Sequence, residues 1–295
     1  MRRAIIFLCF YVSIVNSQET VFEKSNNAIK ESLNDTWLLE GTNDEIFKIK
    51  SYKPIYMMFT NYVSGVNIAP SSGSGMNYNE DSFDFIDSEL KFQLSFKTRV
   101  VNKPFGLPLD LWAAYTQSSR WQIFNGEISR PFRETNYEPE FMAVFKTNYN
   151  FLGMQGSHVL VSFNHQSNGR SNPFSRSWNR IIFEVGLDSD NFSILIRPWI
   201  RLSEDAELDD NPEIVDFIGK GELILEHYFN NFSIYTTIRH NLRFNNKSAG
   251  GIEANLRWHI KKNLALQAQV FHGYGESLLD YNYKQTMLGL GFLLN

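Results

Sequence analysis

Three polar side chains, His165, Ser167 and Asn179, stand where a regular alternation predicts apolar ones. In the first segment, the residues at every second position before His165 are Val159, Val161 and Phe163. In the next segment, those after Asn179 are Ile181, Phe183, Val185 and Leu187. Residues at such alternate positions, which share one face of a strand, are said here to have the same parity. If the connection turns symmetrically about Asn172 and Pro173, His165 lies directly across from Asn179, at the spacing of cross-strand partners. The three side chains then converge on the apolar face of a predicted sheet.

These residue types can carry out nucleophilic catalysis. A serine hydroxyl is a weak nucleophile until an adjacent imidazole accepts its proton, which His165 would do for Ser167. The other ring nitrogen needs a partner, and the carbonyl of Asn179 can accept that N–H without burying a carboxylate near hydrocarbon. The chain has no G-x-S-x-G motif, so the elbow of soluble hydrolases is not the source of this group. The alternative interpretation is a pair of polar strand ends with no chemical role.

The strands that would position these residues are predicted by apolar and polar residues that alternate at every second position. The alternation is clearest over residues 86–100 and recurs over 192–202, 232–244 and 252–260. In the first of these segments the apolar parity holds Ile86, Leu90, Phe92, Leu94, Phe96 and Val100, and the polar parity holds Glu89, Lys91, Gln93, Ser95, Lys97 and Arg99. Strands of this kind turn one face to an apolar environment and the other to water or charge.

Twelve such strands are expected, and their number is even, as in bacterial outer-membrane barrels. They lie near residues 52–64, 83–100, 109–119, 140–150, 157–167, 177–187, 191–202, 215–229, 231–244, 250–261, 263–274 and 285–294. Tight and longer polar connections alternate, which is typical of short periplasmic turns and long outer loops. The expected fold is all-β, a twelve-stranded antiparallel transmembrane β-barrel whose narrow lumen is filled by charged side chains. A soluble secreted β-sandwich hydrolase is the alternative fold.

Composition and the N-terminal segment set the context. With 28 Lys and Arg against 32 Asp and Glu, the net charge of −4 gives no basic excess, so a nucleic-acid partner is excluded. Residues 1–17 have the positive start and short apolar stretch of a secretory signal peptide. The only cysteine, Cys9, lies within it, so the mature chain is expected to hold no disulfide or thiolate site. We expect residues 18–50 to form a periplasmic or lumen-entering N-terminal arm and residues 51–295 the barrel.

The segment from His165 to Arg180, His-Gln-Ser-Asn-Gly-Arg-Ser followed by Pro173 and Ser-Arg-Ser-Trp-Asn-Arg, resembles the active-site signature of the outer-membrane phospholipase A family. Further matching stretches are Pro131–Pro139, Asp209–Pro212, Gly273–Ser277 and Asp280–Asn282. The resemblance extends from Tyr52 to the end of the chain. It implies a twelve-stranded barrel in the bacterial outer membrane that hydrolyses acyl esters of glycerophospholipids and lysophospholipids, as a phospholipase of the A1/A2 type, and depends on calcium.

The resemblance also implies roles for particular residues. Ser167 would be the nucleophile, His165 the base and Asn179 its orienting partner, and the Gly169 amide would stabilise the oxyanion. The active family member is a homodimer, in which calcium is held by the hydroxyl matching Ser175, the carbonyl matching Arg170 and a carbonyl matching Ser129 from the partner. Oxygen ligands and water suit this hard cation. A non-catalytic barrel, either a porin or a surface-interaction protein, is the competing class.

Two departures from the family pattern and one further residue bear on these expectations. Asn172 replaces an acidic residue, which would weaken a calcium site in the monomer, and the last residues lack the usual terminal aromatic, which would affect membrane insertion. Gln117 continues the apolar parity of residues 109–119. An amide facing hydrocarbon is costly unless paired, so we expect Gln117 to meet its own copy in a two-fold dimer. The alternative is that Gln117 reaches water at the headgroup level.

Overall fold

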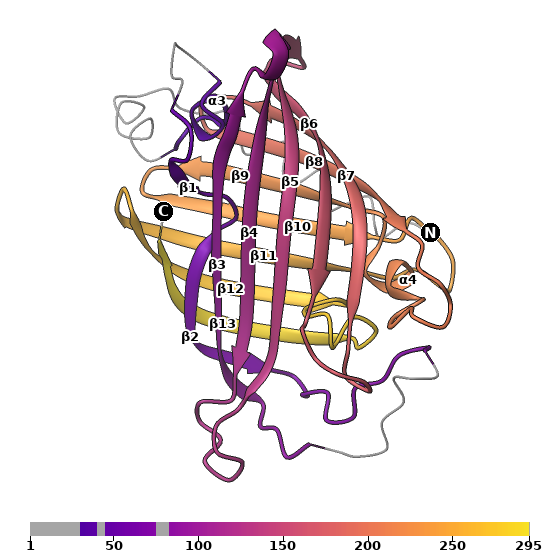
Figure 1. The fold of residues 1–295 in the computed structure, drawn as a ribbon. Helices are drawn as coiled ribbons and strands as arrows, with labels where there is room; N and C mark the ends of the chain where they lie inside the picture. Colours follow the sequence, from indigo (N-terminus) through magenta and orange to yellow (C-terminus); the bar gives the residue numbers. More distant parts are fainter. Residues whose placement is uncertain (1–29, 40–44, 75–82, 295) are drawn as a thin grey trace.

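In the computed structural model, residues 30–39, 45–74 and 83–294 are described; the predicted signal peptide lies outside them. Twelve antiparallel strands of the described chain close into a barrel (Figure 1), because β2 pairs with both β13 and β3. They are β2 (Ile55–Val63), β3 (Ser88–Asn102), β4 (Leu109–Trp121), β5 (Phe132–Phe151), β6 (Met154–Ser167), β7 (Ser177–Asp188), β8 (Phe192–Leu202), β9 (Gly221–Phe229), β10 (Phe232–His240), β11 (Gly250–Lys261), β12 (Leu264–Gly273) and β13 (Gln285–Leu294). A short additional strand, β1 (Ile49–Ser51), pairs with β3 beyond the end of β2. The predicted fold class is confirmed.

Four predicted strand bounds differ from those observed by four residues or more, and the first of these strands, expected at 83–100, begins only at Ser88. The strand expected at 140–150 begins at Phe132, because residues 132–139 continue the pairing with β4. The segment expected at 215–229 starts with the short helix α4 (Ile214–Ile218), and its strand begins only at Gly221. The apolar side chains of α4 pack on Trp178, Trp199 and Leu278 and do not face outward. The strand expected at 231–244 ends at His240, so its last apolar residues lie in a loop.

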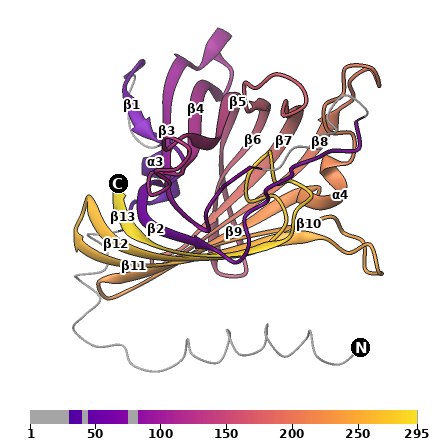
Figure 2. The same ribbon diagram turned by 90° about the horizontal axis from the view of Figure 1, so that it is seen from below.

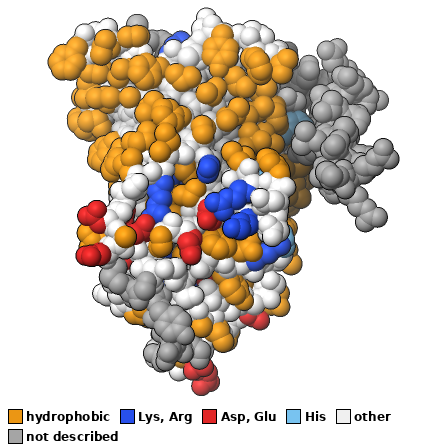
Figure 3. All heavy atoms as spheres, turned by 90° about the vertical axis from the view of Figure 1, so that its right-hand side faces the viewer, with side chains coloured by type: hydrophobic (Ala, Val, Ile, Leu, Met, Phe, Trp, Pro, Cys, Tyr) orange, Lys and Arg blue, Asp and Glu red, His pale blue; other side chains and the backbone are white. Residues whose placement is uncertain are grey.

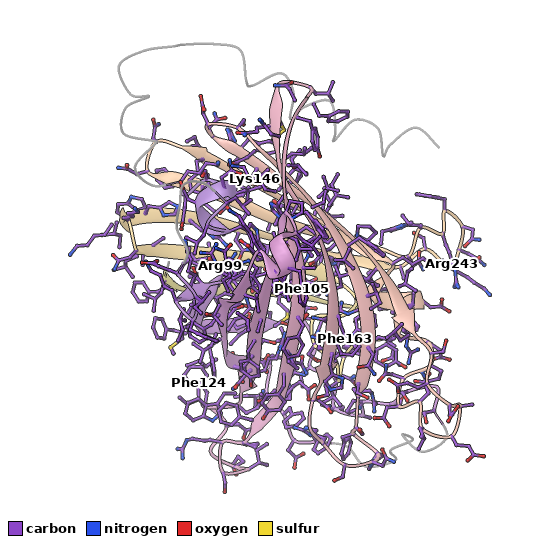
Figure 4. The ribbon with its side chains drawn as sticks, turned by 45° about the horizontal axis from the view of Figure 1, so that its top comes forward. Arg99, Phe105, Phe124, Lys146, Phe163 and Arg243 are labelled. Atoms are coloured by element: carbon purple, nitrogen blue, oxygen red, sulfur yellow. The ribbon has the colours of Figure 1, made fainter. Side chains whose placement is uncertain are left out.

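Connections at the two ends of the barrel differ in length, as predicted. At one end five short turns join β3 to β4, β5 to β6, β7 to β8, β9 to β10 and β11 to β12. At the other end lie the connections 64–87, 122–131, 168–176, 203–220, 241–249 and 274–284. Figure 4 shows Phe105 in the turn that contains the 3₁₀-helix η1 (Pro104–Gly106) and Phe124 in a loop of the opposite end. None of the helices in the described chain is both long and apolar enough to cross a bilayer.

The outer surface of the wall is apolar. Figure 3 shows hydrophobic side chains covering one part of this surface, and acidic and basic ones gathered next to them. Exposed apolar residues of the predicted parities include Leu94, Phe96, Phe163, Phe183, Ile200, Leu256, Trp258, Leu288 and Leu290. One position differs: a β-bulge between Arg99 and Val101 shifts the alternation, so Val101 is more exposed than Val100.

The lumen holds buried ion pairs, as the charged parity predicted. Figure 2 shows the two walls, β3 to β8 and β9 to β13, facing each other. Between them, the carboxylate of Glu276 lies 2.9 Å from Lys91 Nζ and 2.8 Å from Arg120 Nη2. The guanidinium of Arg133 joins two further buried carboxylates. Such pairing offsets the cost of removing charges from water.

The N-terminal segment before the barrel reaches the lumen through Trp37, which is 3% exposed. The indole lies edge-on to Trp112, with 5.3 Å between ring centroids, and Lys97 Nζ sits 3.3 Å from the Trp37 ring centroid. The preceding helix α3 (Leu33–Thr36) begins after Ser32, whose side chain accepts a hydrogen bond from the Asp35 amide.

Candidate active site

Strands β6 and β7 bring His165 and Asn179 together. The two residues are register partners, and 2.9 Å separates His165 Nδ1 from Asn179 Oδ1. Ser167 lies two residues further along β6 and pairs with Ser177 in the same register. The predicted symmetric connection between the two strands is therefore confirmed. All three side chains of the candidate group are partly exposed, and the contact through Nδ1 leaves Nε2 of the imidazole as the nitrogen that can act as a base.

The buried side chain of Asn168 holds the loop between these strands in shape. Its Oδ1 accepts hydrogen bonds from the Arg170 and Arg176 amides at 3.3 and 3.0 Å, and its Nδ2 donates to the Phe174 carbonyl at 2.8 Å. The Asn168 amide also donates to the Arg176 carbonyl. The loop therefore returns to β7 in a fixed register, which positions Asn179 opposite His165.

Gly169 follows Ser167 by two residues and adopts a backbone conformation that favours glycine. Its φ is +65°, and a Cβ atom at this position would lie 3.2 Å from the ring of Tyr137. A side chain would therefore be strained by the backbone and crowded by the ring. The glycine keeps its exposed peptide unit beside the end of β6, close in sequence to the candidate nucleophile.

Glu204, which the sequence reasoning missed, contacts Asn179 from the other side. Asn179 Nδ2 donates a hydrogen bond of 3.0 Å to Glu204 Oε1. Burial raises the pKa of the Glu204 carboxyl, and the nearby charge of Asp209 raises it further, while Arg201 opposes this shift. A signal for this residue was present: Leu202 lies opposite Asn179, and Glu204 continues the parity of Leu202. The same rule had singled out His165, Ser167 and Asn179.

Ser175 lies in the β6–β7 loop beside a carboxylate. Its hydroxyl donates a 2.5 Å hydrogen bond to Asp210 Oδ2, and the neighbouring Asn211 accepts a hydrogen bond of 2.9 Å from the Ser177 amide. The loop after β8 thus packs against the start of β7. Among the described residues, no three His, Cys, Asp or Glu side chains gather in a way that could hold a metal ion. A cation near Ser175 would instead rely on hydroxyl and carbonyl oxygens.

Arg170 is anchored to β5. Its Nη2 donates to the carbonyls of Phe132 and Arg133 at 3.2 and 2.5 Å, and its Nε lies 3.5 Å from a carboxylate oxygen of Glu134. The side chain therefore points toward the start of β5. These contacts fix the position of the Arg170 main chain relative to the wall.

The other two predicted residues lie on neighbouring elements. Gln117, Tyr137 and Ser167 occupy one row of register partners across β4, β5 and β6. Neighbouring strands are about 4.8 Å apart, so Gln117 lies two strand spacings, or about 10 Å, from the nucleophile at the same level of the wall. Ser129 is exposed in the β4–β5 loop with a φ of +61°, and its amide donates to the Gly126 carbonyl. The structure thus places Gln117 level with Ser167 and Ser129 in a separate loop.

A closed β-barrel with an apolar outer surface that carries a serine, a histidine and an asparagine on one wall is the arrangement expected of a membrane-embedded hydrolase. The chain belongs to the phospholipase A1 family: the family model described as Phospholipase A1 matches residues 33–294. Phospholipase A1 of Salmonella typhimurium is 36% identical over 253 residues, covering 86% of this chain and 83% of the relative. Phospholipase A1 of Escherichia coli is 39% identical over 218 residues, covering 72% and 73%.

Solved structures agree with this assignment. Outer membrane phospholipase A from Escherichia coli superposes with a TM-score of 0.75 at 36% identity, covering 84% of this chain and 99% of that one. The outer membrane phospholipase of Salmonella typhi, described as a dimer with bound calcium, gives a TM-score of 0.77 at 34% identity, covering 92% and 98%. The chain is therefore an outer-membrane phospholipase and an ester hydrolase, which sets aside the porin and soluble-sandwich alternatives.

Proposed function

We propose that this enzyme hydrolyses the acyl esters of glycerophospholipids and lysophospholipids with Ser167 as nucleophile, His165 as base and Asn179 as its orienting partner, and that it needs calcium and dimerisation. The observation that carries the proposal is the hydrogen bond between His165 Nδ1 and Asn179 Oδ1 on the outer wall. The wall faces lipid, so a substrate can reach the site by diffusing within the membrane. In the same proposal, residues 1–17 are a signal peptide, 18–50 the N-terminal arm and 51–295 the barrel.

The chemistry follows the usual two steps of acyl transfer. Ser167 Oγ forms a bond to the ester carbonyl carbon while its proton passes to His165 Nε2. The acyl–oxygen bond then breaks, and the proton moves from the imidazolium to the leaving glycerol oxygen. Water repeats the sequence on the acyl-enzyme and releases the fatty acid. Asn179 holds the imidazole in the required tautomer, and the Gly169 amide donates to the oxyanion.

The residues near Ser175 fit a calcium ion. Ser175 provides a hydroxyl oxygen and Arg170 a carbonyl oxygen, and the Asp210 carboxylate beside Ser175 adds negative charge. A hard cation prefers such oxygen donors together with water. We propose that the ion is held by Ser175 and Arg170 of one subunit together with Ser129 of the partner subunit. It would supply positive charge where the oxyanion develops. Asn172, in place of an acidic residue, leaves the monomer with a weaker site.

The calcium proposal predicts a shift in the calcium requirement of Ser175→Ala. Replacement of one oxygen ligand by water should raise the calcium concentration for half-maximal hydrolysis by about tenfold, with activity retained at saturation. The assay uses purified enzyme in detergent micelles with a phospholipid ester, across a calcium titration and with a chelator. Ser203→Ala, an exposed serine of the loop after β8, is the matched control. An unchanged titration for Ser175→Ala would show that the ion is held elsewhere.

Dimerisation is proposed to use the wall that carries Gln117. Its amide already has two weak contacts within its own chain: Tyr115 Oη donates to Oε1 at 3.3 Å, and Nε2 donates to Ser119 Oγ at 3.4 Å. The amide is therefore partly satisfied in the monomer, and its need for a partner is smaller than the sequence suggested. The stronger support for a dimer through this wall is that Gln117 lies in the same row of register partners as Ser167. A two-fold contact there would place both active sites beside the interface.

Gln117→Leu is expected to weaken the dimer modestly. Polar contacts in membranes contribute about 0.6 kcal/mol, so the dimer dissociation constant should rise about threefold and hydrolysis should fall at low enzyme concentration. Cross-linking in micelles, with and without calcium, measures the dimer. His272→Leu, an exposed polar residue of β12, is the control. Wild-type dimerisation and hydrolysis by Gln117→Leu would rule out this role, and a fully active monomer would rule out activation by dimerisation.

A further inference from the structure

We infer that Glu204 is a positioning residue of the hydrolase, which fixes the amide of Asn179 and, through that amide, the tautomer of His165. This inference rests on the proposed Ser-His-Asn mechanism and extends it by a fourth member. The chain of contacts is continuous: Glu204 Oε1 lies 3.0 Å from Asn179 Nδ2, and Asn179 Oδ1 lies 2.9 Å from His165 Nδ1. Glu204 belongs to the loop after β8 and touches neither Ser167 nor the imidazole in any described contact.

The need for such a residue follows from the symmetry of an asparagine amide. One end of the amide accepts hydrogen bonds and the other donates them, and a rotation by half a turn exchanges the two ends. If Asn179 presented its NH₂ group to the imidazole, Nδ1 would have to be the acceptor. The proton would then reside on Nε2, and His165 could not take the proton of Ser167. An asparagine alone therefore leaves the base free to adopt the wrong tautomer.

An ionised carboxylate removes this ambiguity because it can only accept hydrogen bonds. With Glu204 on one side, the NH₂ group of Asn179 must face the carboxylate, and its carbonyl must face His165. Nδ1 then carries the proton and Nε2 is left unprotonated toward the nucleophile. The negative charge also polarises the amide, which favours the imidazolium formed when Ser167 loses its proton. Glu204 thus contributes what the carboxylate of a Ser-His-Asp triad contributes, but from one residue further away.

The loop after β8 is held so that Glu204 reaches Asn179. Leu202 is the register partner of Asn179, and Glu204 follows two residues later on the same side of the chain. Further along the loop, Asp209 is paired with Arg201 at 2.7 Å, and the side chain of Asn211 accepts from the Ser177 amide. The loop is therefore tied both to β8 and to the start of β7.

The surroundings of Glu204 let its carboxyl take up a proton at a higher pH than an exposed carboxyl does. Burial and the charges of Asp209 and Asp210 raise the pKa of Glu204, while Arg201 and the hydrogen bond from Asn179 oppose the shift. When pH falls through this raised pKa, the carboxyl gains a proton and can itself donate, so it no longer selects one orientation of Asn179. The acid side of the activity profile should therefore contain a step that Glu204→Gln lacks.

The first test compares Glu204→Gln in two backgrounds. In the wild-type background we expect kcat to fall about tenfold, the size typical of residues that orient a ligand, with KM unchanged. In an Asn179→Ala background the same substitution should have no further effect, because Glu204 acts only through Asn179. Glu207→Gln, an exposed carboxylate of the same loop, is the matched control and should retain wild-type kcat. An equal loss in both backgrounds would show that Glu204 only supports the loop and would overturn the inference.

In the second test, Glu204→Gln is expected to raise the rate of hydrolysis instead of lowering it. Asn179→Asp places two carboxylates side by side, and because like charges in contact favour protonation of one of them, this variant should be impaired. Adding Glu204→Gln removes the repulsion and supplies an NH₂ group to the introduced carboxylate, so the double variant should hydrolyse several-fold faster than Asn179→Asp alone. A double variant that is no faster than Asn179→Asp would contradict the positioning role.

Folding and mechanism are monitored separately in these variants. Mobility of the unheated barrel on a gel reports whether each variant folds. If Ser167→Ala retains turnover, the proposed mechanism itself fails. If Ser167→Ala is inactive while Glu204→Gln behaves as wild type in kcat and pH profile, only the role of Glu204 is refuted.

Discussion

Ser167→Ala is expected to lower ester hydrolysis by about ten-thousandfold or more while the barrel still folds, because loss of a serine nucleophile removes the covalent route. The residue is partly exposed at the end of β6, and alanine fits there without strain. Asn179→Ala should cost much less, since water can partly replace an uncharged orienting group. Initial rates on a phospholipid ester in micelles with saturating calcium measure both effects.

The control for this substitution is close at hand. Ser177 is the register partner of Ser167, so Ser177→Ala removes a hydroxyl from the same row of the wall. The Ser177 amide would still donate to Asn211, because the bond involves only its backbone. We expect this variant to hydrolyse within a few-fold of wild type. Near-wild-type turnover by Ser167→Ala, or an equal loss in both variants, would refute the assignment of the nucleophile.

Much of the barrel could be predicted because a strand with one lipid face and one charged face repeats every two residues. The alternation no longer predicts which face a residue occupies where the backbone departs from a regular strand. The bulge between Arg99 and Val101 inserts one residue and exchanges the faces, which no apolar count detects. The apolar residues of α4 resemble a short strand in sequence, and their helical form depends on packing against Trp178 and Trp199, which lie on other strands.

The active site, too, could be predicted only in part. His165 and Asn179 could be predicted to meet because two adjacent strands and a short connection fix their register. Asp210 and Glu204 could not be placed beside Ser175 and Asn179, because the loop that carries them folds back through contacts with residues distant in sequence. Parity could have marked Glu204 as a polar residue on an apolar face, but it would not have indicated which amide the carboxylate reaches.

Strand β5 connects the lumen to the active-site loop through Arg133. The carbonyl of Arg133 accepts from the guanidinium of Arg170, whose own carbonyl is the proposed calcium ligand. The side chain of Arg133 points the other way, into the lumen, where it lies 2.8 Å from Glu89 and 2.5 Å from Asp280. All three side chains of this cluster are fully buried. The strand that holds the active-site loop is thus itself held by an ion-pair cluster.

Arg133→Met should therefore destabilise the barrel strongly without altering the chemistry. Two carboxylates would remain buried without their cation, and breaking a buried ion pair in this way costs about 3–5 kcal/mol. The free energy of unfolding in lipid vesicles, measured by denaturant titration, should fall by this amount. The carbonyl that holds Arg170 is unchanged, so the folded fraction should keep its kcat.

Arg243→Met provides the comparison, because its ion pair with Asp216 is equally short at 2.6 Å but both side chains are more than a third exposed. Figure 4 shows Arg243 far from the barrel axis. Solvent screens such a pair, so its loss should cost less than about 1 kcal/mol. Combining Arg133→Met with Glu89→Gln removes one of the stranded charges and should recover part of the lost stability. Equal destabilisation by Arg133→Met and Arg243→Met, or no recovery in the double variant, would mean that the stability of β5 comes from its ladder and packing, and that the buried charges contribute little.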